Sequence, residues 1–307
     1  MQTILGSNGV IANEISRLLP QYTDKVRQVS RHPEKVNDED DLMIADLTDY
    51  SQTEKAVQGS EIVYLTVGLD YNYQTWQEKW PKIMTNVIDA CKKHQARLVF
   101  FDNVYMYGKV NGWMTEDTAY NPCSRKGEIR ARIAAQLMEE VKKGNLTALI
   151  ARSADFYGKS PLSLVGATVF DRFAKQQKAQ IMLSDSFKHS FTYIPDAGKA
   201  TALLGNTDNA YNQVWHLPTD NNVLSIKEFV HMAADAFDCK PEYMVFKKWM
   251  LSMVALFNPV IKESMEMLYQ LDSDYLFDSS KFDTNFKEFI KTDYKKGIFE
   301  TALRYNL

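Results

Sequence analysis

The chain has 307 residues, enough for one large domain or a domain with an appended lobe, and either buries a sizeable core. Its formal net charge of −3 does not favour a nucleic-acid-binding surface, so we expect a small-molecule partner and no nucleic acid. The three cysteines stand far apart without a Cys-x-x-Cys pair, which predicts neither a metal site nor a disulfide framework. No signal peptide is visible, and we expect a cytoplasmic protein without a membrane span.

The first stretch of the chain predicts a strand, a glycine turn and a helix. Residues 1–5 form an apolar strand, and apolar residues at helical spacing follow the turn. Gly6 allows a tight turn, and Gly9 leaves room for a pyrophosphate at the helix N-terminus. Ala12 is small enough for the helix to pack against the strand. The alternative is an ordinary glycine-rich turn. We predict a dinucleotide cradle, formed by Gly6, Asn8, Gly9, Val10 and Ile11.

The next two strands deliver polar residues that suit the adenosine end of such a cofactor. Residues 25–30 are a strand ending at Arg31, which could pair with a 2′-phosphate and so favours NADP over NAD. The alternative is a solvated arginine. Asp46, after a strand at 42–45, either accepts hydrogen bonds from the adenine amino group or caps a turn, and Leu47 lies beside it. Ser51 is expected to cap the following helix.

Two later strands complete the predicted nucleotide site. Residues 62–65 form a strand, after which the backbone of Thr66, Val67 and Gly68 is expected to lie along the cofactor. Residues 97–101 suit a central parallel strand, and the loop after it should emerge at the carboxyl edge of the sheet, where ligands bind. Strands alternating with helices predict an α/β fold with a Rossmann-type doubly wound parallel sheet.

At this point the sequence resembles the extended short-chain dehydrogenase/reductase family, specifically its NAD-dependent epimerase/dehydratase group. The matching segments are residues 6–12, 45–48, 107–108, 115–117, 121–124, Arg152, 156–158 and 189–197. The resemblance implies a dinucleotide-binding domain at 1–152, to which 191–214 return, and a smaller C-terminal substrate lobe at 153–190 and 215–307. It also implies a homodimer formed through the helix near Arg130.

The family's catalytic residues are all replaced. This chain has Asn103 in place of a serine or threonine, Lys126 in place of a tyrosine and Arg130 in place of a lysine. Asn103 can hydrogen-bond a carbonyl oxygen. Lys126 can donate a proton only if burial depresses its pKa strongly. The alternative is that Lys126 and Arg130 bind cofactor phosphate or ribose, or face solvent.

Other side chains are candidates for proton transfer or substrate contact. Tyr105 and Tyr107 follow the strand at 97–101 and are candidate catalytic residues with Asn103 and Lys126. The resemblance places Asp155 and His189 at substrate-binding positions, and Tyr157, on the loop after the next strand, is a further candidate for substrate contact. A carboxylate repels phosphate, so these replacements do not favour a nucleotide-sugar substrate. The alternatives are aromatic packing for the tyrosines and an ordinary loop position for His189.

An apolar segment at 243–257 needs its own explanation. It is too short, and too interrupted by lysines, to span a bilayer. Trp249, Met250, Met253 and Phe257 would share a helical face. We expect this face to form core or the wall of a pocket for an apolar ligand; attachment to lipid or to a partner is the alternative.

The leading function is therefore an NAD(P)-binding, epimerase/dehydratase-like oxidoreductase that moves a hydride to or from a small carbonyl or alcohol substrate. Its active site is non-standard. The alternative is a catalytically silent NAD(P)-binding sensor or interaction protein, which the joint loss of three catalytic positions would explain.

Overall fold

The computed structural model describes residues 1–160 and 163–305, in which the chain divides into two compact units. The first unit comprises Met1–Met106, Arg125–Ser153 and Ala197–Leu217, and the second comprises Tyr107–Ser124, Ala154–Asp196 and Pro218–Leu307. These bounds resemble the predicted domain limits, except that residues 107–124 and 191–196 fall in the second unit, and Ser153 and residues 215–217 in the first. The predicted functional domains remain a prediction.

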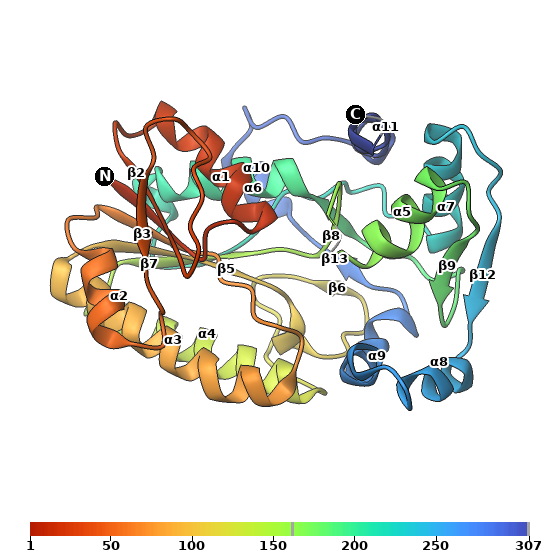
Figure 1. The fold of residues 1–307 in the computed structure, drawn as a ribbon, viewed down its shortest axis with the longest axis horizontal. Coiled ribbons are helices and arrows are strands. Elements are labelled where there is room, and N and C mark those ends of the chain that lie inside the picture. Colours follow the sequence, from red (N-terminus) through yellow and green to blue (C-terminus); the bar gives the residue numbers. More distant parts are fainter. Residues whose placement is uncertain (161–162, 306–307) are drawn as a thin grey trace. The chain divides into compact units, whose positions relative to one another are not determined.

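A parallel seven-stranded sheet forms the centre of the first unit (Figure 1). Its strands are β1 (Gln2–Leu5), β2 (Val26–Ser30), β3 (Asp41–Ile44), β4 (Ile62–Leu65), β5 (Arg97–Asp102), β7 (Ala148–Arg152) and β11 (Val214–His216). Their order across the sheet is β11-β7-β5-β4-β1-β2-β3, and every pair is parallel. The chain therefore winds outward in both directions from β1 and β4, which confirms the predicted doubly wound α/β fold.

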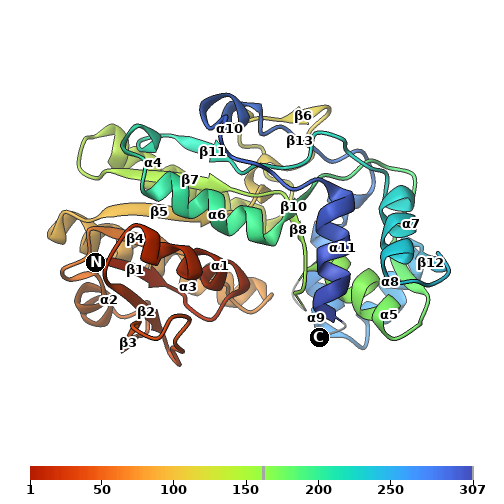
Figure 2. The same cartoon turned by 90° about the horizontal axis from the view of Figure 1, so that it is seen from above.

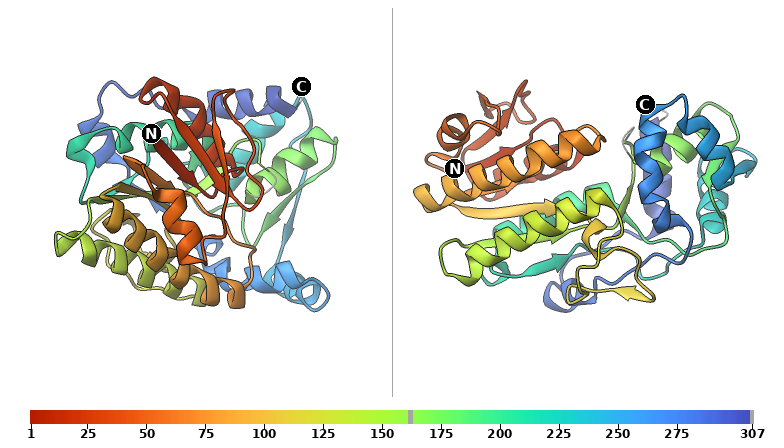
Figure 3. Two further views of the ribbon diagram at one scale, coloured as in Figure 1. Left: turned by 60° about the vertical axis from the view of Figure 1, so that its left-hand side comes forward. Right: turned by 90° about the horizontal axis from the view of Figure 1, so that it is seen from below.

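Helices cover both faces of this sheet. On one face lie α2 (Tyr50–Val57), α3 (Tyr73–His94) and α4 (Arg125–Lys142), and on the other lie α1 (Val10–Leu18) and α6 (Ile194–Gly205) (Figures 1 and 2). Figure 3 shows α3 and α4 side by side across their face, where they pack together. Long apolar stripes on α3 and α4 bury Trp80, Val87 and Ile133 against the strands. The sheet is covered on both sides, which explains why β1, β4 and β7 read as continuous buried runs.

The cap of α2 differs from the prediction. Asp49, rather than Ser51, occupies the N-cap position, and its carboxylate accepts a hydrogen bond from the backbone N–H of Gln52 at 2.9 Å. Ser51 lies inside the first turn of α2, so its prediction as the cap was wrong. Asp49 caps the helix because it is the last residue with an extended backbone, and from this position a side-chain oxygen reaches the backbone N–H groups of the first helical turn.

The second unit is built from three short parallel strand pairs and several helices. The paired strands are β6 (Trp113–Met114) with β13 (Leu276–Phe277), β8 (Asp155–Tyr157) with β10 (Phe191–Tyr193), and β9 (Ala179–Met182) with β12 (Tyr243–Phe246). The helices are α5 (Asp171–Ala174), α7 (Ile226–Ala236), α8 (Lys248–Ala255), α9 (Pro259–Ser264), α10 (Ser280–Asn285) and α11 (Tyr294–Tyr305). Ser225 caps α7 through a reciprocal capping box with Glu228, as a helix start near Ser225 predicts.

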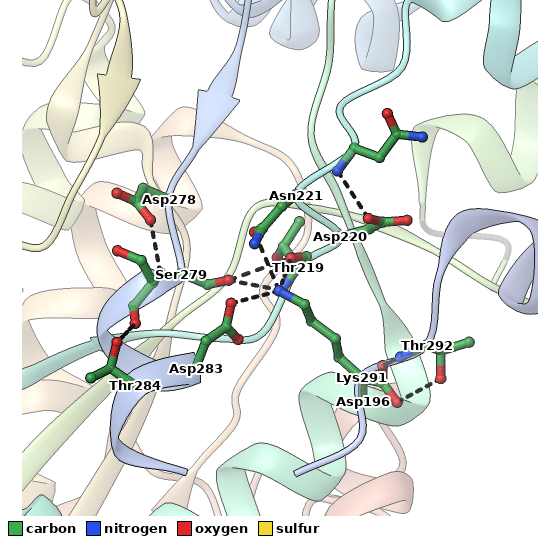
Figure 4. A network of polar contacts seen from close by, with 12 residues as sticks. Asp196, Thr219, Asp220, Asn221, Asp278, Ser279, Asp283, Thr284, Lys291 and Thr292 are labelled. Atoms are coloured by element: carbon green, nitrogen blue, oxygen red, sulfur yellow. Dashed lines mark hydrogen bonds and ion pairs between the residues drawn. The ribbon is translucent and has the colours of Figure 1, made fainter. Parts of the chain in front are cut away.

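A polar network fixes the segment that leads into α11 (Figure 4). The Lys291 ammonium donates to the Asp283 carboxylate at 2.6 Å, to the Thr219 carbonyl at 3.1 Å and to the Asn221 side chain at 3.2 Å. The backbone N–H of Thr292 donates to the Asp196 carboxylate at 2.6 Å. These bonds attach the segment before α11 to other parts of the second unit, so we interpret Lys291 as a structural residue.

The apolar face predicted within residues 243–257 is largely exposed, so its prediction as core was wrong. This segment folds as β12 followed by α8, and the side chains of Trp249 and Met253 are 65% and 59% exposed. Phe257, just after α8, is 90% exposed. Trp249, Met250 and Met253 lie on α8, as the spacing predicts, whereas Phe257 lies beyond its end. Met250 is partly exposed, and the buried residue of α8 is Leu251. Among the described helices, none combines the length and apolar character needed to cross a bilayer.

Candidate cofactor and active site

The glycine turn after β1 has the geometry of an anion cradle. Gly6 has φ +92°, and a Cβ at this position would lie 2.7 Å from the backbone of Val67, so only glycine fits. Gly9 is the N-cap residue of α1 and offers no side-chain acceptor, and the first turn of this helix carries no acidic residue. The first turn of the helix therefore presents backbone N–H groups and the positive dipole end without a negative side chain. A pyrophosphate suits such a site.

Neighbouring side chains hold the turn in place. Asn8 has φ +76°, and its side chain donates to the His32 carbonyl at 2.5 Å and accepts from the Glu34 N–H at 3.1 Å. The Thr66 hydroxyl donates to the Leu5 carbonyl at 3.2 Å. The turn is thus tied both to the loop after β2 and to the end of β4. The predicted residues Gly6, Asn8, Gly9, Val10, Ile11, Thr66, Val67 and Gly68 come together at one edge of the sheet.

The adenosine-end candidates lie after β2 and β3. The pKa of Asp46 is lowered first by Thr48, whose backbone N–H and hydroxyl donate to Asp46 Oδ1 at 2.9 and 2.8 Å. The charge of the exposed Arg31 lowers it further. Asp46 thus stabilises a turn, and its contact with the adenine amino group remains a prediction. Leu47 is buried, and its carbonyl accepts from Asn86 at 2.9 Å. The preference for NADP remains a prediction.

A buried ion cluster lies at the carboxyl end of β5. The Asp102 carboxylate accepts a hydrogen bond from Arg130 Nε at 2.8 Å and a second contact from Arg130 Nη2. Its other oxygen accepts from Arg152 Nε at 3.4 Å. The Arg130 guanidinium also lies over the rings of Trp80, at 4.5 Å, and Phe100, at 4.9 Å. Arg130 is 4% exposed, so the alternative that it faces solvent was wrong.

Lys126 and Asn103 are also held inside the first unit. Lys126 is fully buried, which excludes a solvent-facing role, and its ammonium lies 4.7 Å from the centre of the Tyr71 ring. The N–H of Asn103 donates to Asp102 at 2.9 Å, and its side-chain oxygen accepts from the Tyr105 N–H at 3.1 Å. The Tyr105 ring stacks on Trp76. Asn103 therefore shapes the turn after β5, and the catalytic roles of Asn103, Tyr105 and Lys126 remain predictions.

The tyrosine candidates of the second unit are core side chains in this structure. Tyr107 is 1% exposed and meets Tyr120 edge-on. Tyr157 is equally buried, among aromatic rings that include Tyr193 and Tyr294, and burial raises its pKa well above the ordinary value. Its hydroxyl is buried and has no hydrogen-bond partner within the described part of the chain. The catalytic role of Tyr107 and the substrate contact of Tyr157 remain predictions.

Asp155 and His189 form a pair in the second unit. His189 Nε2 lies 3.0 Å from Asp155 Oδ2, and the imidazole stacks flat on Tyr275 with ring centres 4.2 Å apart. His189 is 2% exposed, whereas the Asp155 side chain is 25% exposed. The ring is therefore fixed by its neighbours, and His189 is not an ordinary loop residue. The parallel register of β8 and β10, in which Asp155 stands opposite Phe191, brings the two residues together.

Comparisons with known proteins agree with this architecture. The model of the NAD dependent epimerase/dehydratase family matches residues 3–215, more than half of the chain. The chain belongs to this family. The predicted resemblance is confirmed. A comparison with curated proteins gives no match.

Solved structures of three enzymes are similar to this family member in fold. The dTDP-glucose 4,6-dehydratase DesIV from Streptomyces venezuelae, with NAD and TYD bound, aligns over 100% of this chain and 97% of its own, at 13% identity and TM-score 0.81. UDP-glucuronic acid 4-epimerase from Bacillus cereus, in complex with NAD, aligns over 100% and 99%, at 15% identity and TM-score 0.80. UDP-glucose 4-epimerase from Thermus thermophilus, also with NAD, aligns over 100% and 99%, at 16% identity and TM-score 0.80.

Two features of this family member were missed by reasoning from the sequence. The first is the cluster of Asp102 with Arg130 and Arg152, and the second is the pair of Asp155 with His189. A partial signal existed for the first, because Asp102 and Arg152 end neighbouring strands and stand opposite each other in register. No comparable signal places Arg130 beside them, since that depends on how α4 lies on the sheet.

Proposed function

We propose that this chain binds a nicotinamide dinucleotide, with the pyrophosphate on the turn between Gly6 and Ile11. The observation that carries the proposal is the cradle itself: a left-handed Gly6 against Val67, and an α1 N-terminus with no side-chain cap and no acid. The family and the NAD named with its structural neighbours support the same cofactor class. When bound, the cofactor would supply or accept the hydride.

We propose further that the chain is an epimerase/dehydratase-like oxidoreductase acting on a small carbonyl or alcohol. Lys126 is the favoured proton donor, because it occupies the family's tyrosine position and is buried, whereas the cation at the lysine position is bound to Asp102. The neighbours named above are enzymes of sugar nucleotides. For this chain the partly exposed Asp155 carboxylate favours a substrate without phosphate groups nearby.

Parallel titrations of NADPH and NADH, followed by nicotinamide fluorescence, test the cofactor proposal. We expect Arg31→Ala to weaken NADPH by roughly tenfold to a hundredfold and to leave NADH nearly unchanged, because only NADPH carries the 2′-phosphate. Arg17→Ala, an exposed arginine on α1, is the matched control and should change neither. Equal weakening of both cofactors would contradict the role given to Arg31, and no binding of either would refute the cradle.

A second candidate function is a catalytically silent NAD(P) sensor. The observation that favours it is the use of Arg130 in a buried ion pair at the position where the family has its catalytic lysine. A screen of carbonyl substrates separates the two functions. The enzyme would be established if the protein transfers a hydride, if Lys126→Met abolishes this transfer while the cofactor still binds, and if Lys142→Met on the same helix leaves it unchanged. Tight cofactor binding with no turnover would establish the sensor.

A further inference from the structure

The second unit exposes an apolar patch at the turn between α8 and α9. These two short helices pack against each other, as Figures 1 and 3 show. The patch consists of Trp249, Met253, Val254, Leu256, Phe257 and Val260. Leu256 is 78% exposed and Val260 is 62% exposed. Isolated exposed apolar residues are common, but six within twelve positions form a surface that marks an interaction site.

The patch is held outward by ordered structure. Leu251 of α8 is buried, and so are Met267 and Leu268 in the turn of helix after α9. The Asn258 side chain caps α9 by accepting from the N–H groups of Val260 and Ile261, at 3.0 and 3.2 Å. These contacts anchor the pair of helices α8 and α9 through its buried residues, and Leu256 and Phe257 lie at the exposed turn between the two helices.

The border of the patch is cationic. Lys247, Lys248 and Lys262 are exposed, and residues 243–262 contain no aspartate or glutamate. Glu242, directly before them, is exposed but forms an ion pair with Lys178 at 3.0 Å. Glu263 and Glu266 follow Lys262 and are only partly exposed. Apolar side chains of the Trp, Leu and Phe type flanked by lysines match the interfacial region of an anionic bilayer, where rings enter the acyl boundary and ammonium groups meet the phosphates. Helices of eight and six residues can lie in that interface but cannot cross it.

We propose that the α8–α9 patch docks this protein peripherally on an anionic lipid surface. The apolar tip enters the headgroup region, and the three lysines supply electrostatic attraction. This docking is independent of cofactor binding at the glycine turn, because it uses other residues of the chain.

Flotation with lipid vesicles tests the proposal. The purified full chain should float with vesicles of phosphatidylcholine mixed with phosphatidylglycerol, and bind at least roughly tenfold more weakly to phosphatidylcholine alone. Leu256→Asp combined with Phe257→Asp should abolish flotation, whereas Ile290→Asp, at an 80% exposed position elsewhere in the second unit, should leave it unchanged. Each of Lys247→Gln, Lys248→Gln and Lys262→Gln should weaken binding by about fivefold, and added salt should do the same.

The remaining outcomes overturn the proposal. Equal binding to both kinds of vesicle would show that the lysines do not select an anionic surface. No flotation, together with a dimer that Phe257→Asp dissociates in light scattering, would assign the patch to a second copy of this chain. No flotation and no dimer would leave the lipid proposal refuted.

Discussion

Replacing Asp102 by Asn tests whether the buried ion cluster is structural. The substitution keeps the size of the side chain and removes its charge. In the native protein the carboxylate accepts hydrogen bonds from Arg130, from Arg152 and from the Asn103 N–H. Both guanidinium groups are buried, so neither can turn to solvent when the carboxylate is lost.

The expected loss of stability is large. Removing one partner of a buried ion pair typically costs about 3–5 kcal/mol, because the other charge stays buried without compensation. The Asn side chain could still accept through its oxygen, but its NH₂ group would face a guanidinium, where donor meets donor. The rings of Trp80 and Phe100 continue to hold Arg130, which limits the loss to the lower part of that range. We expect the free energy of unfolding to fall by about 3 kcal/mol.

Urea unfolding, followed by circular dichroism and tryptophan fluorescence, measures this change. Asp49→Asn is the matched control, because it makes the same chemical change at an exposed helix cap, where Asn also caps well. The free energy of unfolding of this variant should stay within about 0.5 kcal/mol of that of the native protein. A loss below about 1 kcal/mol for Asp102→Asn would refute the reasoning, since it would mean that water or rearrangement compensates the buried Arg130 guanidinium.

Three further changes have definite expected outcomes. Gly6→Ala should lower the free energy of unfolding by roughly 2–4 kcal/mol and abolish dinucleotide binding, because it adds a clash with Val67 to a left-handed backbone. Gly112→Ala, at φ +102° with open space around it, should show the backbone strain alone. Gly297→Ala in α11 should lower the free energy of unfolding by about 1–3 kcal/mol, although alanine favours helices, because the new Cβ would lie 2.9 Å from the Tyr157 ring. The atom nearest to this Cβ is the Tyr157 hydroxyl. Adding Tyr157→Phe removes that hydroxyl, so the double mutant should recover part of the loss. The pKa of Glu140 is lowered from 4.5 to about 2, first by Lys92 and then by Asn145 and Lys143. The stability that the Glu140 carboxylate contributes is therefore present above pH 4.5 and is lost as the pH falls toward 2. Glu140→Gln should therefore flatten the acid limb of a melting-temperature profile, and an unchanged acid limb would contradict this.

The fold of the first unit could be predicted because its signals are local. Apolar strands alternate with helical patterns, and the glycine turn directly follows β1. The parallel order then follows from the handedness of the connections. The error at Ser51 is also local: a serine and an aspartate stood within one turn, and only the backbone conformation at Asp49 decides which one caps.

The wrong prediction for the apolar segment at 243–257 shows what local sequence patterns cannot determine. A helical stripe of Trp249, Met253 and Phe257 predicts one face of a helix but does not say what lies against it. In the structure Leu251 occupies the inward face, so the stripe faces outward. The same limit applies to the site. The sequence predicted that Lys126 and Arg130 lie on one helix, where the resemblance places the family's catalytic residues. Their burial and their partners could not be predicted, because both depend on tertiary packing.

The residues that the resemblance places at the family's catalytic positions are not equivalent to one another. At the proposed lysine position, Arg130 is bound by Asp102 and lies over aromatic rings, which suits a planar guanidinium and gives this residue a structural use. At the proposed tyrosine position, Lys126 is fully buried, and its ammonium lies 4.7 Å from the centre of the Tyr71 ring. Arg130 thus serves an ion pair inside the core, whereas Lys126 is the cation that the resemblance places where the family donates a proton. This difference is the physical reason to look for catalysis at Lys126 rather than at Arg130.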